Sequence, residues 1–328
     1  MTQTSTVRPA VSAGRRAGGV ALAVVAGVTL AVQSRLNGEL AVRLADPIGA
    51  ATISFGSGLL VLAVLVPLLP GGRAGVGLLR TALREGRIRP WQCIGGMCGG
   101  LLVAAQGLTV PTLGVAVFIV AVVAGQSSSS LLVDRAGVGP AGRQPVTRPR
   151  LAGSVLTVCA VLLAVGDRIG HPSALALAVL PLVAGVGIAW QQAVNGHVRA
   201  ASGSAMVASL VNFWTGTAVL LLAFAVSVAL RGLPDHLPRG PWWLYVGGPL
   251  GIVFIALGAA VVRYTGVLLL GLGMIAGQVT GALLVDEIVP GDAGRPGWNT
   301  LVGDALTLVA VGVAVLPARR PRGALSGR

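Results

Sequence analysis

The stretch Ala124–Asp134, AGQSSSSLLVD, occurs twice in this chain in almost the same form. It returns as AGQVTGALLVD at residues 276–286, 152 positions further on. Glutamine and aspartate are scarce in this sequence, so the match of both at the same spacing indicates an inherited duplication. The fold is therefore expected to contain two related units.

The composition places these units in a membrane. Hydrophobic residues make up 54% of the sequence and charged residues 10%, whereas water-soluble domains keep about 25% of their residues charged. Apolar stretches of roughly 18 residues, long enough to cross a hydrocarbon core as a helix, alternate with short charged segments. We therefore expect an all-α membrane protein with ten transmembrane helices near residues 17–34, 49–69, 91–109, 112–133, 151–166, 175–194, 204–230, 241–262, 266–285 and 299–316.

The basic residues, all of them arginine, indicate how these helices are oriented. With alternate loops assigned to opposite sides, the side that holds the N-terminus carries 18 of the 24 basic residues and the other side carries six. Because basic residues concentrate on the cytoplasmic side, both termini are expected in the cytoplasm. The net charge of +14 then reflects contact with the lipid bilayer, and no nucleic-acid partner is expected.

Four further motifs repeat along the chain, at offsets of 158, 158, 152 and 150 residues. The matched pairs start at Gln33 and Gln191 (QxxxNG), Phe55 and Phe213 (FxxG), Trp91 and Trp243 (WxxxGGxxG), and Leu151 and Leu301 (LxGxxL). The repeating unit therefore contains five helices. Because an odd number of crossings makes the second unit start on the opposite side, we expect two inverted repeats.

The predicted organisation has four parts. They are a cytoplasmic N-terminal tail at residues 1–16, a first five-helix repeat at 17–166, a second at 175–316, and a cytoplasmic C-terminal tail at 317–328.

The repeated motifs, the glycine-rich third helix and the AGQxxxxLLVD ending of the fourth resemble the YdcZ-like family of the drug/metabolite transporter (DMT) superfamily. The resemblance covers roughly residues 17–316 and matches the fused, two-unit form of that family. It implies an EamA-like transporter architecture and an exporter in the inner, or plasma, membrane. Its substrates are mostly unassigned, and export follows from the resemblance alone.

We therefore expect a multi-pass secondary transporter that moves a small metabolite or drug-like solute by alternating access. The small multidrug-resistance branch of the superfamily uses a membrane glutamate in its first helix, but residues 17–34 contain no acid. The cysteines, Cys93, Cys98 and Cys159, fall in predicted spans as small buried hydrophobes, and neither a metal nor a cofactor is expected. A homodimer is left open.

Amide side chains are the leading candidates for solute binding. Gln33 and Asn37 lie one helical turn apart, as do Gln191 and Asn195, so each pair shares one helix face. An amide that lines a cavity donates and accepts hydrogen bonds to a polar solute. The alternative is a structural hydrogen bond between helices, worth about 1 kcal/mol.

Further candidates lie elsewhere in the predicted helices, and two of them, Gln126 and Gln278, lie deeper in theirs. Gln126 and Gln278 belong to the repeated stretch and are assigned either to the transport path or to helix packing. Ser54 and Asn212 occupy matching positions, and Trp190 and Trp214 are expected to form aromatic walls.

Asp304 is a carboxylate inside a predicted span, and it marks a candidate site for ion or proton coupling because ionisable groups at such depth are costly. Its position near the start of the tenth span also allows it to reach water. Asp134 and Asp286 are expected at solvated or arginine-paired helix ends, with Arg135 as the obvious partner of Asp134.

Two other classes of protein compete with this prediction. A membrane-embedded enzyme acting on a lipid-linked substrate needs clustered acids or histidines, but His171, His197 and His236 lie in predicted loops. A receptor or scaffold needs a sizeable extramembrane domain, which the sequence lacks. We therefore expect a transporter and not an enzyme.

Overall fold

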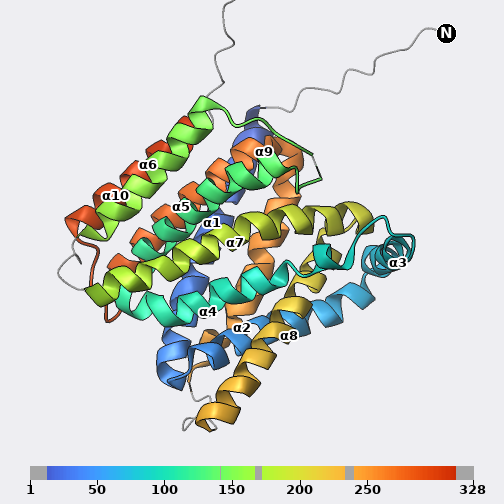
Figure 1. Cartoon of the computed structure of the whole chain (residues 1–328), viewed down its shortest axis with the longest axis horizontal. Coiled ribbons are helices and arrows are strands. Elements are labelled where there is room, and N and C mark those ends of the chain that lie inside the picture. Colours follow the sequence, from blue (N-terminus) through green and yellow to red (C-terminus); the bar gives the residue numbers. More distant parts are fainter. Residues whose placement is uncertain (1–12, 141, 167–171, 233–239, 315–328) are drawn as a thin grey trace, which may run out of the picture.

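The computed structural model describes residues 13–140, 142–166, 172–232 and 240–314, and most of the two predicted cytoplasmic tails lies outside them. The described residues are almost entirely helical (Figure 1). The elements are α1 (Ala13–Leu44), α2 (Pro47–Leu68), α3 (Pro70–Arg84), η1 (Pro90–Cys93), α4 (Gly96–Leu113), α5 (Val115–Ala136), α6 (Arg148–Ala164), α7 (Pro172–Ser202), α8 (Ala205–Arg231), η3 (Trp242–Val246), α9 (Gly247–Ile288) and α10 (Trp298–Ala314).

Six helices in the described part are long and apolar enough to cross a membrane. They are Ala17–Leu44, Pro47–Leu68, Pro90–Leu113, Val115–Ala136, Ala176–Ser202 and Ala205–Arg231, and Trp242–Leu257 and Trp298–Ala314 are shorter apolar helices. These eight segments coincide with eight of the ten predicted spans. The protein is thus a multi-pass helical membrane protein, and the number of crossings stays a prediction.

The eighth and ninth predicted spans lie on one helix. α9 continues without interruption from Gly247 to Ile288, where the sequence predicted two helices. The matching helices α4 and α5 are separate because Gly114, with φ of 84°, ends α4. Pro111 precedes that break, whereas Arg263 stands 152 positions later. Since proline removes a helical hydrogen bond, its absence from the second copy favours the continuous helix.

The helix α3, which lies before the predicted third span, was not expected from the sequence. Residues 70–84 were predicted as part of a basic loop but form α3, which is too short to cross a membrane. Its buried residues recur every three or four positions: Gly72, Gly75, Leu79 and Ala82. Such a pattern is typical of a helix with one face packed on the protein.

The helices pair across the two halves of the chain. α1 packs chiefly on α9 and α5 on α7, while α6 lies beside α10 and α2 beside α8 (Figure 1). Each pair joins a helix of the first half to a helix of the second. Neither half therefore forms its main contacts alone.

Glycines set the closest of these approaches. A methyl group on Gly277 of α9 would collide with the carbonyl oxygen of Val24 in α1, and one on Gly125 of α5 would collide with that of Leu182 in α7. The two glycines are 152 residues apart, and their two partners are 158 apart. The same contact therefore occurs twice, at the offsets found in the sequence.

Two more contacts repeat in the same way. Gly96 approaches the carbonyl oxygen of Asn212, and Gly248 approaches that of Ser54. Between α6 and α10, Gly153 faces the carbonyl oxygen of Ala310 and Gly303 faces that of Ala160. Small residues let helices in a membrane come close enough for such backbone contact.

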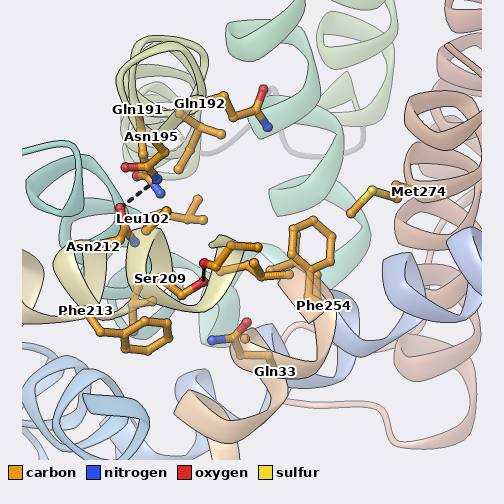
Figure 2. Close-up of a pocket in the computed structure, with 18 of the residues that line it drawn as sticks. Gln33, Leu102, Gln191, Gln192, Asn195, Ser209, Asn212, Phe213, Phe254 and Met274 are labelled. Atoms are coloured by element: carbon orange, nitrogen blue, oxygen red, sulfur yellow. Dashed lines mark hydrogen bonds between the residues drawn. The ribbon is translucent and has the colours of Figure 1, made fainter. Parts of the chain in front are cut away.

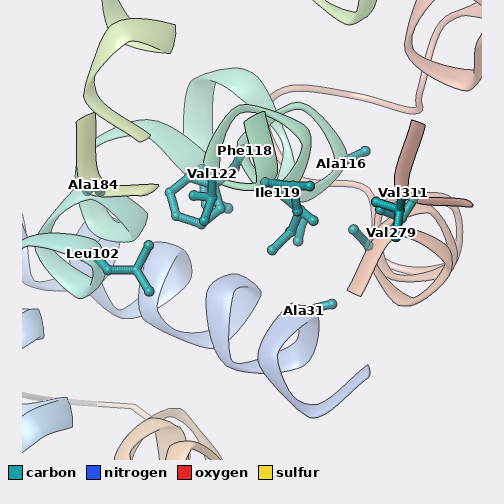
Figure 3. Close-up of a cluster of buried hydrophobic side chains, with 14 residues drawn as sticks. Ala31, Leu102, Ala116, Phe118, Ile119, Val122, Ala184, Val279 and Val311 are labelled. Carbon is teal, nitrogen blue, oxygen red and sulfur yellow. The ribbon is translucent and has the colours of Figure 1, made fainter. Parts of the chain in front are cut away.

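The core is built around α5. All residues from Val115 to Gly125 are buried, as expected for a helix that is apolar on every side. Figure 3 shows its side chains between helices of both halves. The cluster includes Ala31, Leu102, Phe118, Ile119, Val122, Ala184, Val279 and Val311.

Gly125→Ala is expected to lower the free energy of unfolding by about 1–3 kcal/mol, the usual cost of overpacking. The added methyl group meets the backbone of Leu182, which cannot rotate away. Unfolding in detergent micelles measures the effect. Gly312→Ala is the control, because a methyl group there meets no atom within 4 Å. Equal stability of the two variants would contradict the α5–α7 contact.

Candidate functional site

A cavity of about 370 Å³ lies where the two halves meet (Figure 2). Seven helices contribute to its wall, namely α1, α2, α4, α5, α7, α8 and α9. Its volume lies at the lower end of the range of small-molecule sites. It is therefore large enough for a small solute.

Amides form most of the polar lining. Six of the ten predicted solute-binding residues line the cavity, and Gln192 joins them from α7. Since the amides come from five different helices, they surround the space instead of forming one patch. The six are Gln33, Gln126, Gln191, Asn195, Asn212 and Gln278.

Some of these amides are held in place and others have free hydrogen-bonding capacity. Asn195 donates a hydrogen bond of 3.0 Å through Nδ2 to Oδ1 of Asn212 (Figure 2). Oε1 of Gln191 is buried and has no hydrogen-bond partner among the described residues. A buried acceptor without a partner is costly, so this oxygen is suited to accept a hydrogen bond from a solute.

Two matching glycines give the amides room. A methyl group on Gly99 would stand 3.2 Å from Oε1 of Gln191, and one on Gly251 would stand 3.2 Å from Nε2 of Gln33. The glycines of the WxxxGGxxG motif thus fit beside the glutamines of the QxxxNG motif. The sequence predicted the two motifs separately but not this contact between them.

The apolar part of the wall contains an aromatic pair. The rings of Phe55 and Phe213 have centroids 4.9 Å apart and both line the cavity, together with Phe254 and Met274. The sequence showed Phe55 and Phe213 as matched residues of the FxxG motif but assigned neither to the site. The identity of these two residues and their matched spacing could have marked them as candidate site residues.

The cavity carries no negative side chain in the part of the chain that the structure describes. Arg199 of α7 is the one charged residue among its lining residues there, and the sequence had assigned it only to orientation. A cation would therefore find amide oxygens but no counter-charge. The lining suits a neutral or negatively charged solute better than a positively charged one.

Asn37 and Ser54, which the sequence predicted as solute-binding residues, are not among the residues that line this cavity. Nδ2 of Asn37 donates to Oε1 of Gln106 at 2.6 Å, and Nε2 of Gln106 donates to Oγ of Ser34 at 3.0 Å. The first of these is a hydrogen bond between two helices, as in the alternative that the sequence analysis gave for Asn37. Ser54 is buried beside Gly247.

The two predicted aromatic walls also lie elsewhere. Trp190 stacks on Trp91 with ring centroids 6.5 Å apart. Trp214 is 65% exposed and lines a different cavity. Neither tryptophan is among the residues that line the amide cavity.

The two aspartates that end the repeated stretch have different partners. Asp286 is buried and accepts hydrogen bonds from the backbone N–H groups of Val115 at 3.0 Å and Ala116 at 2.8 Å. It thereby caps α5 across the two halves. Asp134 pairs with Arg150 and not with Arg135 as the sequence suggested.

Asp304 is fully buried in α10, and neither of its carboxylate oxygens has a hydrogen-bond partner among the described residues. The sequence allowed it to reach water, but the structure places it inside the protein. Thr300, one turn earlier in α10, lines a polar cavity of about 320 Å³ together with Asp286 and Arg295. Asp304 therefore lies one helical turn from a polar cavity and outside the lining of the amide cavity.

His197, predicted in a loop, lies in α7, where its Nε2 is 2.8 Å from the carbonyl oxygen of Val138. The other two histidines, His171 and His236, fall outside the described residues. Within the described ranges, no three His, Cys, Asp or Glu side chains gather as metal ligands.

Comparisons with known proteins agree with the two-unit organisation. The family model described as "Putative inner membrane exporter, YdcZ" matches the chain twice, over residues 19–163 and 176–315. A solved structure described only as "Crystal structure of protein" aligns with 94% of this chain and 99% of its own, with a TM-score of 0.56 and 21% identity. That likeness concerns the fold alone. No curated protein matches the sequence.

Asp286→Ala is expected to reduce stability by about 0.5–2 kcal/mol, the usual effect of losing a helix cap. Because the cap protects the N–H groups of Val115 and Ala116, amide hydrogen exchange in the first turn of α5 should accelerate. The control is Asp134→Ala, which removes a partly exposed ion pair worth about 0–1 kcal/mol. Unchanged exchange in α5 in the Asp286 variant would contradict the capping role.

Proposed function

Because the chain belongs to the YdcZ family of inner membrane exporters, within the DMT superfamily, we propose that it exports a small solute by alternating access. The observation that carries this proposal is the amide cavity, whose wall is built from both halves of the chain. A site between two repeats changes its exposure when one repeat rocks against the other. Export, rather than uptake, rests on the family.

In this mechanism the two halves act as inverted repeats of five predicted spans each, with α9 carrying the eighth and ninth spans. The repeated glycine contacts support the equivalence of the halves, because each contact that a glycine of one half makes with the other half has a counterpart with the roles exchanged, at the offsets of the sequence motifs. The excess of arginine on one side supports a cytoplasmic location for both termini. Together these features favour a second unit that is inserted in the membrane in the opposite orientation to the first.

The lining of the cavity indicates the chemistry of the solute. Amides both donate and accept hydrogen bonds, and Phe55, Phe213 and Phe254 offer ring faces. Arg199 supplies the positive charge. We therefore expect a neutral or anionic solute with several hydrogen-bonding groups and an apolar or aromatic portion.

Flux into proteoliposomes tests this function, with panels of neutral, anionic and cationic solutes of this size. Gln191→Leu removes an amide from the cavity, and the loss of a hydrogen bond of about 1–3 kcal/mol predicts a fall in flux of about tenfold. Leu230→Ala is the control, since Leu230 is exposed and is not among the residues that line the amide cavity. Flux is expected to stay near that of the original protein in this variant.

Three outcomes would count against the proposal. Equal loss of flux in both variants would show that the amide cavity does not bind the solute. A preference for cations would contradict the proposed solute chemistry. Turnover of a lipid-linked substrate by protein that carries no solute would favour a membrane-embedded enzyme.

We further propose that Asp304 couples transport to a proton or another cation. A fully buried carboxylate without a hydrogen-bond partner in the described structure is costly when ionised, and the binding of a cation removes that cost. The polar cavity one turn away, with Asp286 and Arg295, offers a route to Asp304 from water.

Asp304→Asn is expected to retain exchange of labelled for unlabelled solute but to lose accumulation driven by an ion gradient. Asparagine is close in size to aspartate but cannot carry the charge that coupling requires. Both activities are measured in proteoliposomes with imposed proton or sodium gradients. Glu39→Gln is the control, because Glu39 is a partly exposed residue paired with Arg43 at 2.7 Å and does not line the polar cavity. Undiminished accumulation by the Asp304 variant would rule out the coupling role.

A further inference from the structure

A second large cavity, of about 890 Å³, lies between α2, α3 and α8. Its lining is almost wholly apolar and contains none of the amides of the solute cavity. Leu60 and Trp214, both of which line it, are 68% and 65% exposed. In a membrane protein such an apolar surface faces lipid. We call this cavity the α3 groove.

One charged residue lines the α3 groove in the described structure, and it belongs to α3. Arg73 lies at the start of this helix, and Val76, Leu79 and Leu83 of the same helix also line the groove. The positive charge therefore stands beside apolar side chains. A ligand with one acidic group and a long apolar portion fits that arrangement.

The amphipathic pattern of α3 favours a location of this charge at the membrane surface. Arg73, Arg80 and Arg84 are spaced by seven and four residues and hence share one side of the helix. They are exposed, and no ion pair in the described part of the chain joins them to an acid, whereas Arg87 is paired with Glu85. An amphipathic helix with a basic stripe lies in the interface of a bilayer that contains anionic lipids.

The other face of α3 is fixed to the protein. A methyl group on Gly75 would stand 3.0 Å from the carbonyl oxygen of Ser202 and 3.1 Å from Cβ of Ser204, in the turn between α7 and α8. Leu79 and Ala82 pack in a cluster with Val198 and Val207 of the same two helices. The groove is thus a built feature between packed helices.

We propose that the α3 groove binds an anionic phospholipid of the cytoplasmic leaflet, with one acyl chain against Leu60, Leu79 and Trp214 and the headgroup at Arg73. Basic residues near a membrane surface attract anionic lipids, by about 1 kcal/mol per residue. A second copy of this chain is a poorer occupant, because a symmetric contact over this face would bring two arginine stripes together.

Native mass spectrometry of protein released from nanodiscs tests this site. The nanodiscs contain equal amounts of palmitoyl-oleoyl phosphatidylglycerol and palmitoyl-oleoyl phosphatidylcholine, and the number of each lipid retained per protein is counted. The original protein should retain phosphatidylglycerol in preference to phosphatidylcholine. No transport is measured, so the result is independent of the proposed export.

Two glycines provide a matched pair of variants. Gly56 lines the α3 groove and Gly77 lies on the exposed side of α3, and a methyl group at either position meets no atom within 4 Å. Gly56→Leu should fill the groove and reduce retained phosphatidylglycerol severalfold, while Gly77→Leu should leave it unchanged. Arg73→Gln should lower the preference for phosphatidylglycerol about fivefold and leave retention of phosphatidylcholine unchanged.

Three results would overturn the proposal. Equal lipid retention in the two glycine variants would show that the groove holds no acyl chain. An unchanged preference in Arg73→Gln would place the headgroup elsewhere. A dimer that is present in the original protein and lost in Gly56→Leu would identify the groove as an interface between copies of this chain.

Discussion

The close approach of backbones at glycine is the constraint on which the rest of this structure depends. Lipid tails are as apolar as leucine side chains, so helices in a bilayer associate through tight packing and not through the hydrophobic effect. In the repeated AGQ motif, Gly125 and Gly277 make the contact. The next residue is turned by about 100° on the helix, and Gln126 and Gln278 reach the cavity. One short motif thus pairs the helices and supplies an amide to the site.

The same scaffold carries different polar contacts in its two copies. Where Gly114 separates α4 from α5, the new helix start has free N–H groups, and Asp286 of the other half caps them. The matching stretch of α9 is continuous and offers no such start. Asp134, which matches Asp286 in sequence, pairs with Arg150 instead. The glycines therefore preserve the contacts between helices in both copies, while the polar residues distinguish one half from the other.

Much of this arrangement could be predicted from sequence, because composition and repeats report directly on burial and on duplication. The family resemblance is confirmed by the two matches of the family model. The helix α3 was missed because a 15-residue amphipathic segment lacks the long apolar stretch of a span. The contact of Asn37 with Gln106 was missed because Gln106 belongs to no repeated motif. A single sequence shows which residue types are present but does not show which residues contact each other in the fold.

In the proposed transport cycle, α5 is the element that connects the solute with the coupling ion. It is buried along its first half and packs on α7, α9 and α10. Its N-terminus is capped by Asp286 at the polar cavity near Asp304, and Gln126 further along reaches the amide cavity. Since a packed helix transmits displacement instead of absorbing it, a change of charge near the start of α5 bears on Gln126 near its middle. The separation of the two sites is therefore compatible with coupling, because α5 packs on α10, which carries Asp304, and also lines the amide cavity.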